Sequence, residues 1–295
     1  MRDQHTSRTA EYMAFFRALE SLEPAERRLF TDPYALPLLA GPLRTVARIA
    51  RFGLAGSFVR TILEIGWPYT LSSGVARTRA IDDLVSDAIR GGARQLLLLG
   101  AGFDSRAYRL PEAAKIASFE VDHPATQRAK RERLGALAGR INANVQFVAV
   151  DFEKDDLESR LIQAGFHPAV PTVAVWEGVI SYLTRSAVEG TFAILGRLLV
   201  SASHLVFTYV HKGALDGSRA FPGARRWKSW VRFSGEPFVF GFDPDTLPAT
   251  LRSFGFVLTS DESTEQTGNR YSAPLGRKEL GSQLYRVASA VRAEG

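Results

Sequence analysis

Small and acidic residues follow several predicted strands in the middle of the chain. Residues 95–104 read QLLLLGAGFD, where four consecutive leucines lead straight into a glycine-rich turn. A run that is apolar at every position suits a strand buried on both faces of a parallel sheet. Ligands of open α/β sheets bind beyond the carboxyl ends of the strands. The candidate ligand-binding residues at these ends are Gly100, Gly102, Asp122, Asp151, Phe152 and Glu177.

Each of these residues has a contact to offer a nucleoside-containing cofactor. Glycine lacks a Cβ, so the chain can turn sharply there and a ligand can approach the backbone. An acid at the end of the second predicted strand, Glu120 or Asp122, can accept both hydroxyl protons of a ribose. Asp151 can accept from an exocyclic amine, and the ring of Phe152 can cover an adenine face. For any one acid, capping of the following helix is the alternative. A dinucleotide motif G-x-G-x-x-G would require glycine at position 105, which is Ser105.

The surrounding pattern predicts an α/β fold with a mostly parallel, seven-stranded sheet. Strands alternate with helices from residue 73 onward, which favours a parallel sheet with right-handed crossovers. The chain end is expected to add a closing hairpin, in which a long loop joins the last two strands. After the leucine strand, the predicted strands are residues 115–121, 145–150, 172–176, 204–210, 256–260 and 284–291.

Two further segments flank or interrupt this pattern. Residues 1–72 predict a helical cap, with one helix from Thr9 to Pro24 and an amphipathic stretch over residues 44–65. A membrane-surface helix over residues 46–59 is the alternative, but its scattered arginines favour packing against the core. The remaining domain spans residues 73–295 and contains an insertion over residues 212–242. The insertion is rich in glycine, aromatic and basic residues, and it predicts either a mobile lid or a permanently packed subdomain.

Composition excludes several classes of function. The net charge of 37 − 31 = +6 is spread among acids and predicts no nucleic-acid partner. The absence of cysteine excludes disulfides and thiolate sites, and the five histidines are too dispersed to predict a metal site. No apolar stretch predicts a membrane span or a signal peptide. We therefore expect a cytoplasmic protein with no membrane partner, and we leave the oligomeric state open.

The same residues form a set of motifs with a known counterpart. The chain resembles the leucine carboxyl methyltransferase-like family, which includes protein phosphatase carboxyl methyltransferases and bacterial O-methyltransferases of polyketide and other small-molecule pathways. The resemblance runs over most of the chain. Its motifs are R-T-R-x-I-D-D (77–83), L-G-A-G-F-D-S-R-A-Y-R-L (99–110), E-V-D-H-P (120–124), D-F (151–152), E-G-V-x-x-Y-L (177–183), S-R-T-A (7–10), D-P-Y-A (32–35) and G-E-P-F-x-F-G-F (235–242).

The resemblance implies a class I methyltransferase fold, S-adenosylmethionine as cofactor and a small-molecule acceptor. It implies that Arg77, with Arg79 as a rival, pairs with the methionine carboxylate, and that Gly100 lies against the methionine. In this family Asp122 would hold the ribose, and Asp151 and Phe152 would flank the adenine. Glu177 would close the pocket near the sulfonium. Arg8 is a further candidate cofactor contact.

The acceptor and its chemistry are less constrained. Glu153 stands where the phosphatase-modifying branch tends to carry arginine, which favours the bacterial small-molecule branch. The resemblance favours a carboxylate acceptor oriented by Tyr182. A hydroxyl acceptor would need a base, for which His211 is the candidate at the end of the fifth predicted strand. A nicotinamide-dependent oxidoreductase and a non-catalytic cofactor-binding protein are the alternative functions.

Overall fold

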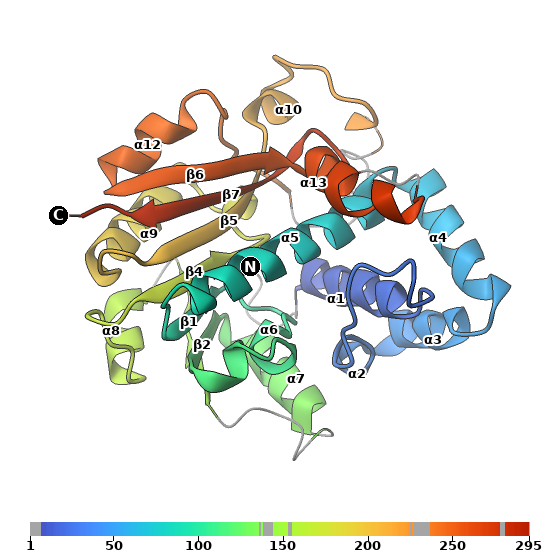
Figure 1. Ribbon diagram of the computed structural model, residues 1–295, viewed down its shortest axis with the longest axis horizontal. Coiled ribbons are helices and arrows are strands. Elements are labelled where there is room, and N and C mark those ends of the chain that lie inside the picture. Colours follow the sequence, from blue (N-terminus) through green and yellow to red (C-terminus); the bar gives the residue numbers. More distant parts are fainter. Residues whose placement is uncertain are drawn as a thin grey trace.

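A seven-stranded sheet forms the centre of the molecule, and helices cover both of its faces (Figure 1). The structure is a computed structural model that describes residues 7–135, 137, 144–152, 155–224, 226, 237–277 and 281–294. The strand order is β3-β2-β1-β4-β5-β7-β6. The strands are β1 (Gln95–Leu99), β2 (Ala117–Asp122), β3 (Val145–Ala149), β4 (Thr172–Trp176), β5 (His204–Val210), β6 (Phe256–Ser263) and β7 (Tyr285–Arg292).

Helices precede the sheet and connect its strands. Short 3₁₀ turns lie at Ala113–Lys115, Ile180–Tyr182 and Ala273–Leu275. The described α-helices are α1 (Arg8–Ser21), α2 (Ala35–Leu38), α3 (Gly41–Ala50), α4 (Leu54–Gly66), α5 (Thr70–Arg90), α6 (Arg106–Arg109), α7 (Pro124–Gly135), α8 (Leu157–Gln163), α9 (Arg185–Leu198), α10 (Lys212–Asp216), α12 (Leu247–Ser253) and α13 (Thr264–Tyr271).

The leucine run of β1 is apolar at every position because both faces of the strand are covered. Leu97 and Leu99 belong to a core cluster that includes residues of α8, α9 and α12. Leu96 and Leu98 belong to a second cluster on the opposite face, which includes residues of α5. Side chains alternate along a strand, so two covered faces require apolar residues throughout. This confirms the parallel core of the predicted fold.

The end of the chain closes the sheet. β7 pairs antiparallel with both β5 and β6, whereas the other pairings in the sheet are parallel. The expected hairpin is therefore present, but its connection is not a plain loop. Helix α13 lies within it and begins with a capping box at Ser263 and Gln266. Such a short, polar helix gives little apolar periodicity, which is why the sequence pattern missed it.

Helices α1 to α4 lie together beside the sheet, on the right of Figure 1. Their core includes Phe15, Phe16 and Leu19 of α1 and extends to Phe103 and Leu134 of the main domain. The stretch predicted over residues 44–65 is two helices rather than one. The chain breaks at Gly53, whose φ of +46° is a left-handed conformation that favours glycine.

Backbone hydrogen bonds join the two ends of the insertion to each other and to the 3₁₀ turn that follows β4. Lys212 N–H donates to Phe242 O at 2.8 Å, and Val239 N–H donates to Ser181 O at 2.8 Å. Most of the predicted basic and aromatic cluster (Arg225, Trp227, Lys228, Trp230, Arg232 and Phe233) lies outside the described residues. None of the described helices combines the length and apolarity needed to cross a bilayer.

Candidate active site

The turn after β1 is tightly enclosed. Gly100 and Gly102 have φ of +65° and +47°, which side chains disfavour. A Cβ on Gly100 would lie 2.2 Å from a methyl carbon of Val179, and a Cβ on Gly102 would lie 3.0 Å from Ala10 Cβ of α1. Helix α1 therefore packs directly over the glycine turn. Both glycines are required by conformation and by space, so the backbone of this turn is held in one place.

Asp122 at the end of β2 faces the same turn. Its carboxylate accepts hydrogen bonds from Gly102 N–H and, at 2.6 Å, from His123 N–H. Burial raises the pKa of Asp122 above its ordinary value, although these two amides oppose the shift. The charged form is therefore costly in the absence of further donors. An acid held in this way at a strand end fits a ligand that supplies hydroxyl donors, as a ribose does.

Glu177 at the end of β4 lies between two arginines from different parts of the chain. Arg77 Nε of α5 donates to Glu177 Oε1 at 2.8 Å, and Arg106 Nη1 of α6 lies 2.6 Å from Glu177 Oε2. Burial alone would raise the pKa of Glu177, but the charges of Arg106 and Arg77 hold it below its ordinary value. Glu177 is therefore ionised at neutral pH and fixed by two partners.

These residues are part of a buried ion-pair network. Arg106 also lies 2.8 Å from Asp82 Oδ1 and 2.5 Å from Asp104 Oδ2. Arg17 Nη2 donates to Phe103 O at 2.5 Å, which ties α1 to the turn. With four cations and four anions, the network balances its charge. Its members are Arg17, Arg77, Arg106, Arg109, Asp32, Asp82, Asp104 and Glu177.

Ser105 occupies the position of the third glycine of a dinucleotide motif, and it has its own role. Its hydroxyl donates to Asp32 Oδ2 at 2.6 Å, and Arg109 Nε donates to Ser105 Oγ at 3.1 Å. Asp32 also lies 2.8 Å from Arg17 Nε. Ser105 is therefore part of the contact between the cap and the turn.

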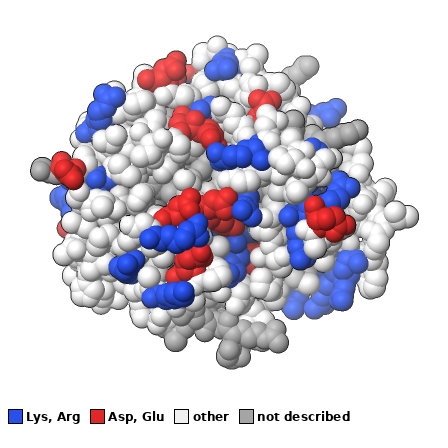
Figure 2. Space-filling model, viewed as in Figure 1, with Lys and Arg blue, Asp and Glu red and all other residues white. Residues whose placement is uncertain are grey.

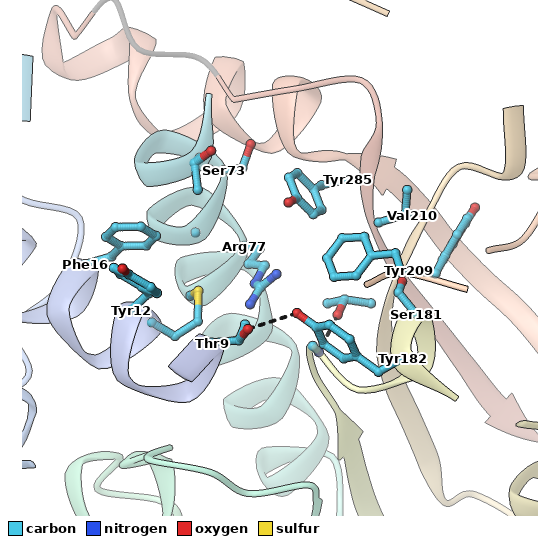
Figure 3. Close-up of a pocket in the computed structure, with 16 residues that line it drawn as sticks. Thr9, Tyr12, Phe16, Ser73, Arg77, Ser181, Tyr182, Tyr209, Val210 and Tyr285 are labelled. Carbon is cyan, nitrogen blue, oxygen red and sulfur yellow. Dashed lines mark hydrogen bonds between the residues drawn. The ribbon is translucent and has the colours of Figure 1, made fainter. Parts of the chain in front are cut away.

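A cavity opens between α1, the start of α5 and the ends of β4, β5 and β7 (Figure 3). Its free volume of about 40 Å³ is enough for a few water molecules. The described lining residues include one charged side chain, Arg77, and no Asp, Glu, His or Lys. They are Thr9, Tyr12, Met13, Phe16, Thr70, Ser73, Gly74, Arg77, Gly178, Ser181, Tyr182, Thr208, Tyr209, Val210, Phe238 and Tyr285.

Tyr182 is held from two sides within this lining. Figure 3 shows its hydroxyl pointing at Thr9, with 3.1 Å between Tyr182 Oη and Thr9 Oγ1. Its ring meets that of Phe238 edge-on, with 4.8 Å between the centroids. Tyr209 bonds instead to Asp261 at 2.7 Å, and burial with the Asp261 charge raises the pKa of Tyr209 well above its usual range. Tyr182 is thus positioned by both the cap and the insertion.

His211 lies apart from the cavity lining. Its Nδ1 accepts from Gly213 N–H at 3.0 Å and caps α10, and its ring lies 5.1 Å from that of Phe221. The residue is buried and is not part of an exposed loop. Burial and the nearby Arg219 charge lower the pKa of His211, which keeps the ring neutral near pH 7. The sequence placed His211 at the end of β5 but could not show that its side chain folds back onto α10.

The remaining candidates differ in their placement. Asp151 and Phe152 follow β3 and are half-buried, and Phe152 packs against the main core cluster. Glu153 lies outside the described residues. Arg79, the rival of Arg77, instead pairs with Asp83 at 3.1 Å and donates to Leu29 O at 2.9 Å. Arg77 lines the cavity, and neither Arg79 nor Arg8 does.

Sequence reasoning missed Arg106, which pairs with Glu177, and Asp82, which pairs with Arg106. Arg106 and Asp82 were visible in the motifs, and Arg106 is almost wholly buried. The motif S-R-A-Y-R places Arg106 and Arg109 three apart, so both reach the same side of one helical turn. That spacing was the available signal for a shared acidic partner.

Comparison with known proteins assigns the family. The family model of leucine carboxyl methyltransferase matches residues 10–196. A protein from Mycolicibacterium gilvum is 30% identical over 298 residues, spanning 96% of this chain and 94% of its own length. The chain belongs to the leucine carboxyl methyltransferase family. A Streptomyces coelicolor relative is 36% identical over 240 residues, spanning 76% of each chain. By name, both relatives are assigned to the S-adenosyl-L-methionine-dependent methyltransferases.

Solved structures confirm the fold of this family member. A Thermobifida fusca protein assigned to the methyltransferases aligns with a TM-score of 0.59 at 15% identity, over 95% of this chain and 94% of its own. A protein of the DUF574 family from Streptomyces avermitilis aligns with a TM-score of 0.57 at 13% identity, over 98% of this chain and 99% of its own. The predicted class I methyltransferase fold is therefore confirmed.

Proposed function

We propose that this family member transfers a methyl group from S-adenosylmethionine to a carboxylate oxygen of a small molecule. The observation that carries the choice of acceptor is the composition of the cavity lining. Among the described residues that line it, none is an Asp, Glu, His or Lys. A carboxylate has a pKa of about 4 and is already ionised near neutral pH, so it needs no general base. A phenol, with a pKa of about 10, would need one.

The donor follows from the family. S-adenosylmethionine supplies a methyl group on an already activated sulfonium, so the protein's task is to align two reactants and exclude water. The geometry of the strand ends supports this assignment, because Asp122 is a half-buried acceptor beside a glycine turn that approaches a ligand through bare backbone. We assign the cofactor contacts to Arg77, Gly100, Gly102, Asp122, Asp151, Phe152 and Glu177.

Within this proposal, Arg77 has two partners. It already pairs with Glu177 through Nε, and its guanidinium also lines the cavity. A guanidinium carries five N–H donors, so it can keep the bond to Glu177 and still bind a carboxylate. We assign the methionine carboxylate of the donor to this group. Glu177 then holds Arg77 in place and keeps the buried charges balanced.

Tyr182 is the proposed orienting residue for the acceptor. Its hydroxyl faces the cavity between the cap and the insertion, and it is anchored by Thr9. His211 remains the candidate base for a hydroxyl acceptor, although its cap on α10 favours a structural role. We divide the chain into a cap over residues 1–72, which supplies Thr9 and Phe16 to the cavity, and a cofactor domain over residues 73–295. The insertion, residues 212–242, supplies Phe238.

Product chemistry tests the acceptor. The enzyme is incubated with S-adenosylmethionine and a panel of matched acids and phenols, and products are sought by mass spectrometry as a gain of one CH₂. Mild alkali then separates the two outcomes, because a methyl ester is hydrolysed back to the acid and a methyl ether is not. Ester products support the proposal. Ether products alone would reassign the acceptor to a hydroxyl.

Binding of the donor is tested separately by calorimetry. S-adenosylmethionine or S-adenosylhomocysteine is expected to bind the wild-type protein, with NAD as the control ligand. Binding of NAD in place of both would overturn the assignment of the donor.

A further inference from the structure

The outer face of the α3–α4 hairpin carries a large apolar surface that no described part of the chain covers. Phe52 and Leu54 between the two helices are 70% and 88% exposed, and Phe58 is 66% exposed. We name this set the α3–α4 face. Its exposed apolar residues are Ile49, Phe52, Leu54, Phe58, Ile62 and Ile65.

Helix α4 is apolar on two sides, and only one of them packs. Val59 and Leu63 contact the cap core, yet no residue of α4 is fully buried. The positions of Leu54, Phe58 and Ile62 repeat every four residues, so they form one stripe along the outer side. A helix that is apolar all round is normally covered. The expected packing of this stretch against the core is therefore met on its inner side only.

Cations without acids border this stripe. The chain from residue 33 to residue 63 contains four arginines and no Asp or Glu. Arg60 turns inward to Glu20 and Glu23, whereas Arg44, Arg48 and Arg51 are exposed. No ion pair joins these three to an acid within the described part of the chain. Figure 2 shows basic atoms at the lower right, where Figure 1 places α3, and a rim without charge over α4.

We propose that the α3–α4 face docks on an anionic lipid surface. Aromatic and aliphatic side chains inserted at the level of the headgroups, with arginines beside them, are the features of an interfacial helix. An anionic surface attracts each nearby basic residue. The apolar stripe supplies the burial and the three arginines supply the matching charge. This departs from the sequence-based expectation of no membrane partner and does not involve a membrane span.

The docking face is connected to the wall of the cavity. Glu64 of α4 accepts from Tyr69 N–H and Ser72 N–H, both at 2.9 Å, and so caps the start of α5. Thr70, Ser73 and Gly74 in that first part of α5 line the cavity. Arg226 of the insertion also reaches this helix, donating to Ile65 O at 3.0 Å. Docking would therefore place the cavity wall near the lipid, where an apolar acid accumulates.

Vesicle co-sedimentation of the full chain tests the proposal. The probes are phosphatidylcholine vesicles with and without phosphatidylglycerol, at low and high salt. Leu54→Ser/Phe58→Ser removes apolar surface, and Arg44→Gln/Arg48→Gln removes charge. Ile162→Ser/Val257→Ser is the matched control, because both residues are exposed apolar positions elsewhere, each 46% exposed. Circular dichroism verifies that each variant is folded.

The expected result is binding to the anionic vesicles that weakens with salt. Partitioning onto these vesicles should fall about tenfold or more in Leu54→Ser/Phe58→Ser. In Arg44→Gln/Arg48→Gln it should fall about fivefold for each charge removed. The control Ile162→Ser/Val257→Ser should bind as the wild type does. Failure to bind anionic vesicles would overturn the proposal. So would a dimer, detected by sedimentation velocity without lipid, that the Leu54→Ser/Phe58→Ser pair dissociates. Vesicle binding is independent of methyl transfer, so its failure would leave the proposed function standing.

Discussion

The cofactor side and the acceptor side of this site are built by different means. Around Glu177 and Arg106, buried charges are paired at 2.5–2.8 Å and tie the cap to the glycine turn. The cavity next to them is lined by rings and hydroxyls, and Arg77 is the charged residue that the two share among those described. One side is thus fixed by electrostatics, and the other is shaped by packing.

This difference fits the two ligands in the proposal. A donor that does not vary can be held by charges, because a buried network is rigid when every member is paired. An acceptor is selected by shape, and rings and hydroxyls of the cap and insertion can be exchanged without leaving a charge unpaired. If the comparison holds, substitutions on the charged side should affect stability and donor binding. Those on the cavity side should affect turnover.

The largest effect is expected from Arg106→Met. This change leaves Asp82, Asp104 and Glu177 buried with one partner fewer, and breaking a buried pair costs about 3–5 kcal/mol. Urea denaturation should show that loss in the free energy of unfolding. Arg90→Gln is the control, because Arg90 pairs with Asp87 and Glu112 at the surface, and its midpoint should not move. Equal midpoints for both variants would refute the idea of a stabilising network.

Asp122→Asn should separate binding from stability. Burial raises the pKa of Asp122 above its ordinary value of 3.8. At pH values above 3.8 the charge of Asp122 therefore destabilises the ligand-free fold. The amide removes that charge, so the unfolding midpoint of the ligand-free protein at pH 7 should stay equal or rise. The affinity for S-adenosylhomocysteine in calorimetry should fall about tenfold or more. Unchanged affinity would remove Asp122 from the cofactor site, and Asp87→Asn serves as the surface control.

Lowering the pH should weaken the ion-pair network, because the charged form of Asp32 stabilises the fold, whereas that of Asp122 destabilises it. Burial alone would raise the pKa of Asp32, but the charges of Arg17 and Arg109 hold this pKa below 3.8 in the folded protein. The stability from this pair is therefore complete above the unfolded value and is lost as the pH falls below 3.8 through the lower folded pKa. Asp32→Asn should flatten this part of the curve of unfolding free energy against pH. A curve with the same slope for both proteins would show that Asp32 is not the group responsible.

On the cavity side, Tyr182→Phe should lower kcat/KM about tenfold and leave the unfolding midpoint nearly unchanged. Thr9→Val removes the same hydrogen bond from its other end. If Tyr182 contacts the acceptor, its loss should exceed that of Thr9→Val. Equal losses would mean that the tyrosine acts only by fixing the cap.

The smallest effect on turnover is expected for His211→Ala. The side chain caps α10, so its removal should cost about 1 kcal/mol of stability and little activity. A general base contributes about 100-fold or more. A loss of that size in His211→Ala, rescued at high pH, would assign His211 as the base and a hydroxyl as the acceptor.

The sequence revealed the charged side better than the cavity. The leucine strand and the acids that follow β2 and β4 could be recognised because a strand end fixes where its next residues lie. The partners of Glu177 could not be predicted, because Arg77 and Arg106 approach from two helices whose crossing no local pattern encodes. Helix α4 was ambiguous for another reason. Its two apolar sides look alike in sequence, although only one meets a core.

Ser105 links the identity of the cofactor to the architecture of the cap. A dinucleotide loop needs glycine at this position, but here its hydroxyl holds Asp32, which in turn holds Arg17 of α1. A mutation toward the dinucleotide motif would therefore loosen the cap in the same step. The same side chain thus departs from the dinucleotide motif and anchors the cap, so a designer who wishes to exchange the cofactor must first give α1 a new anchor.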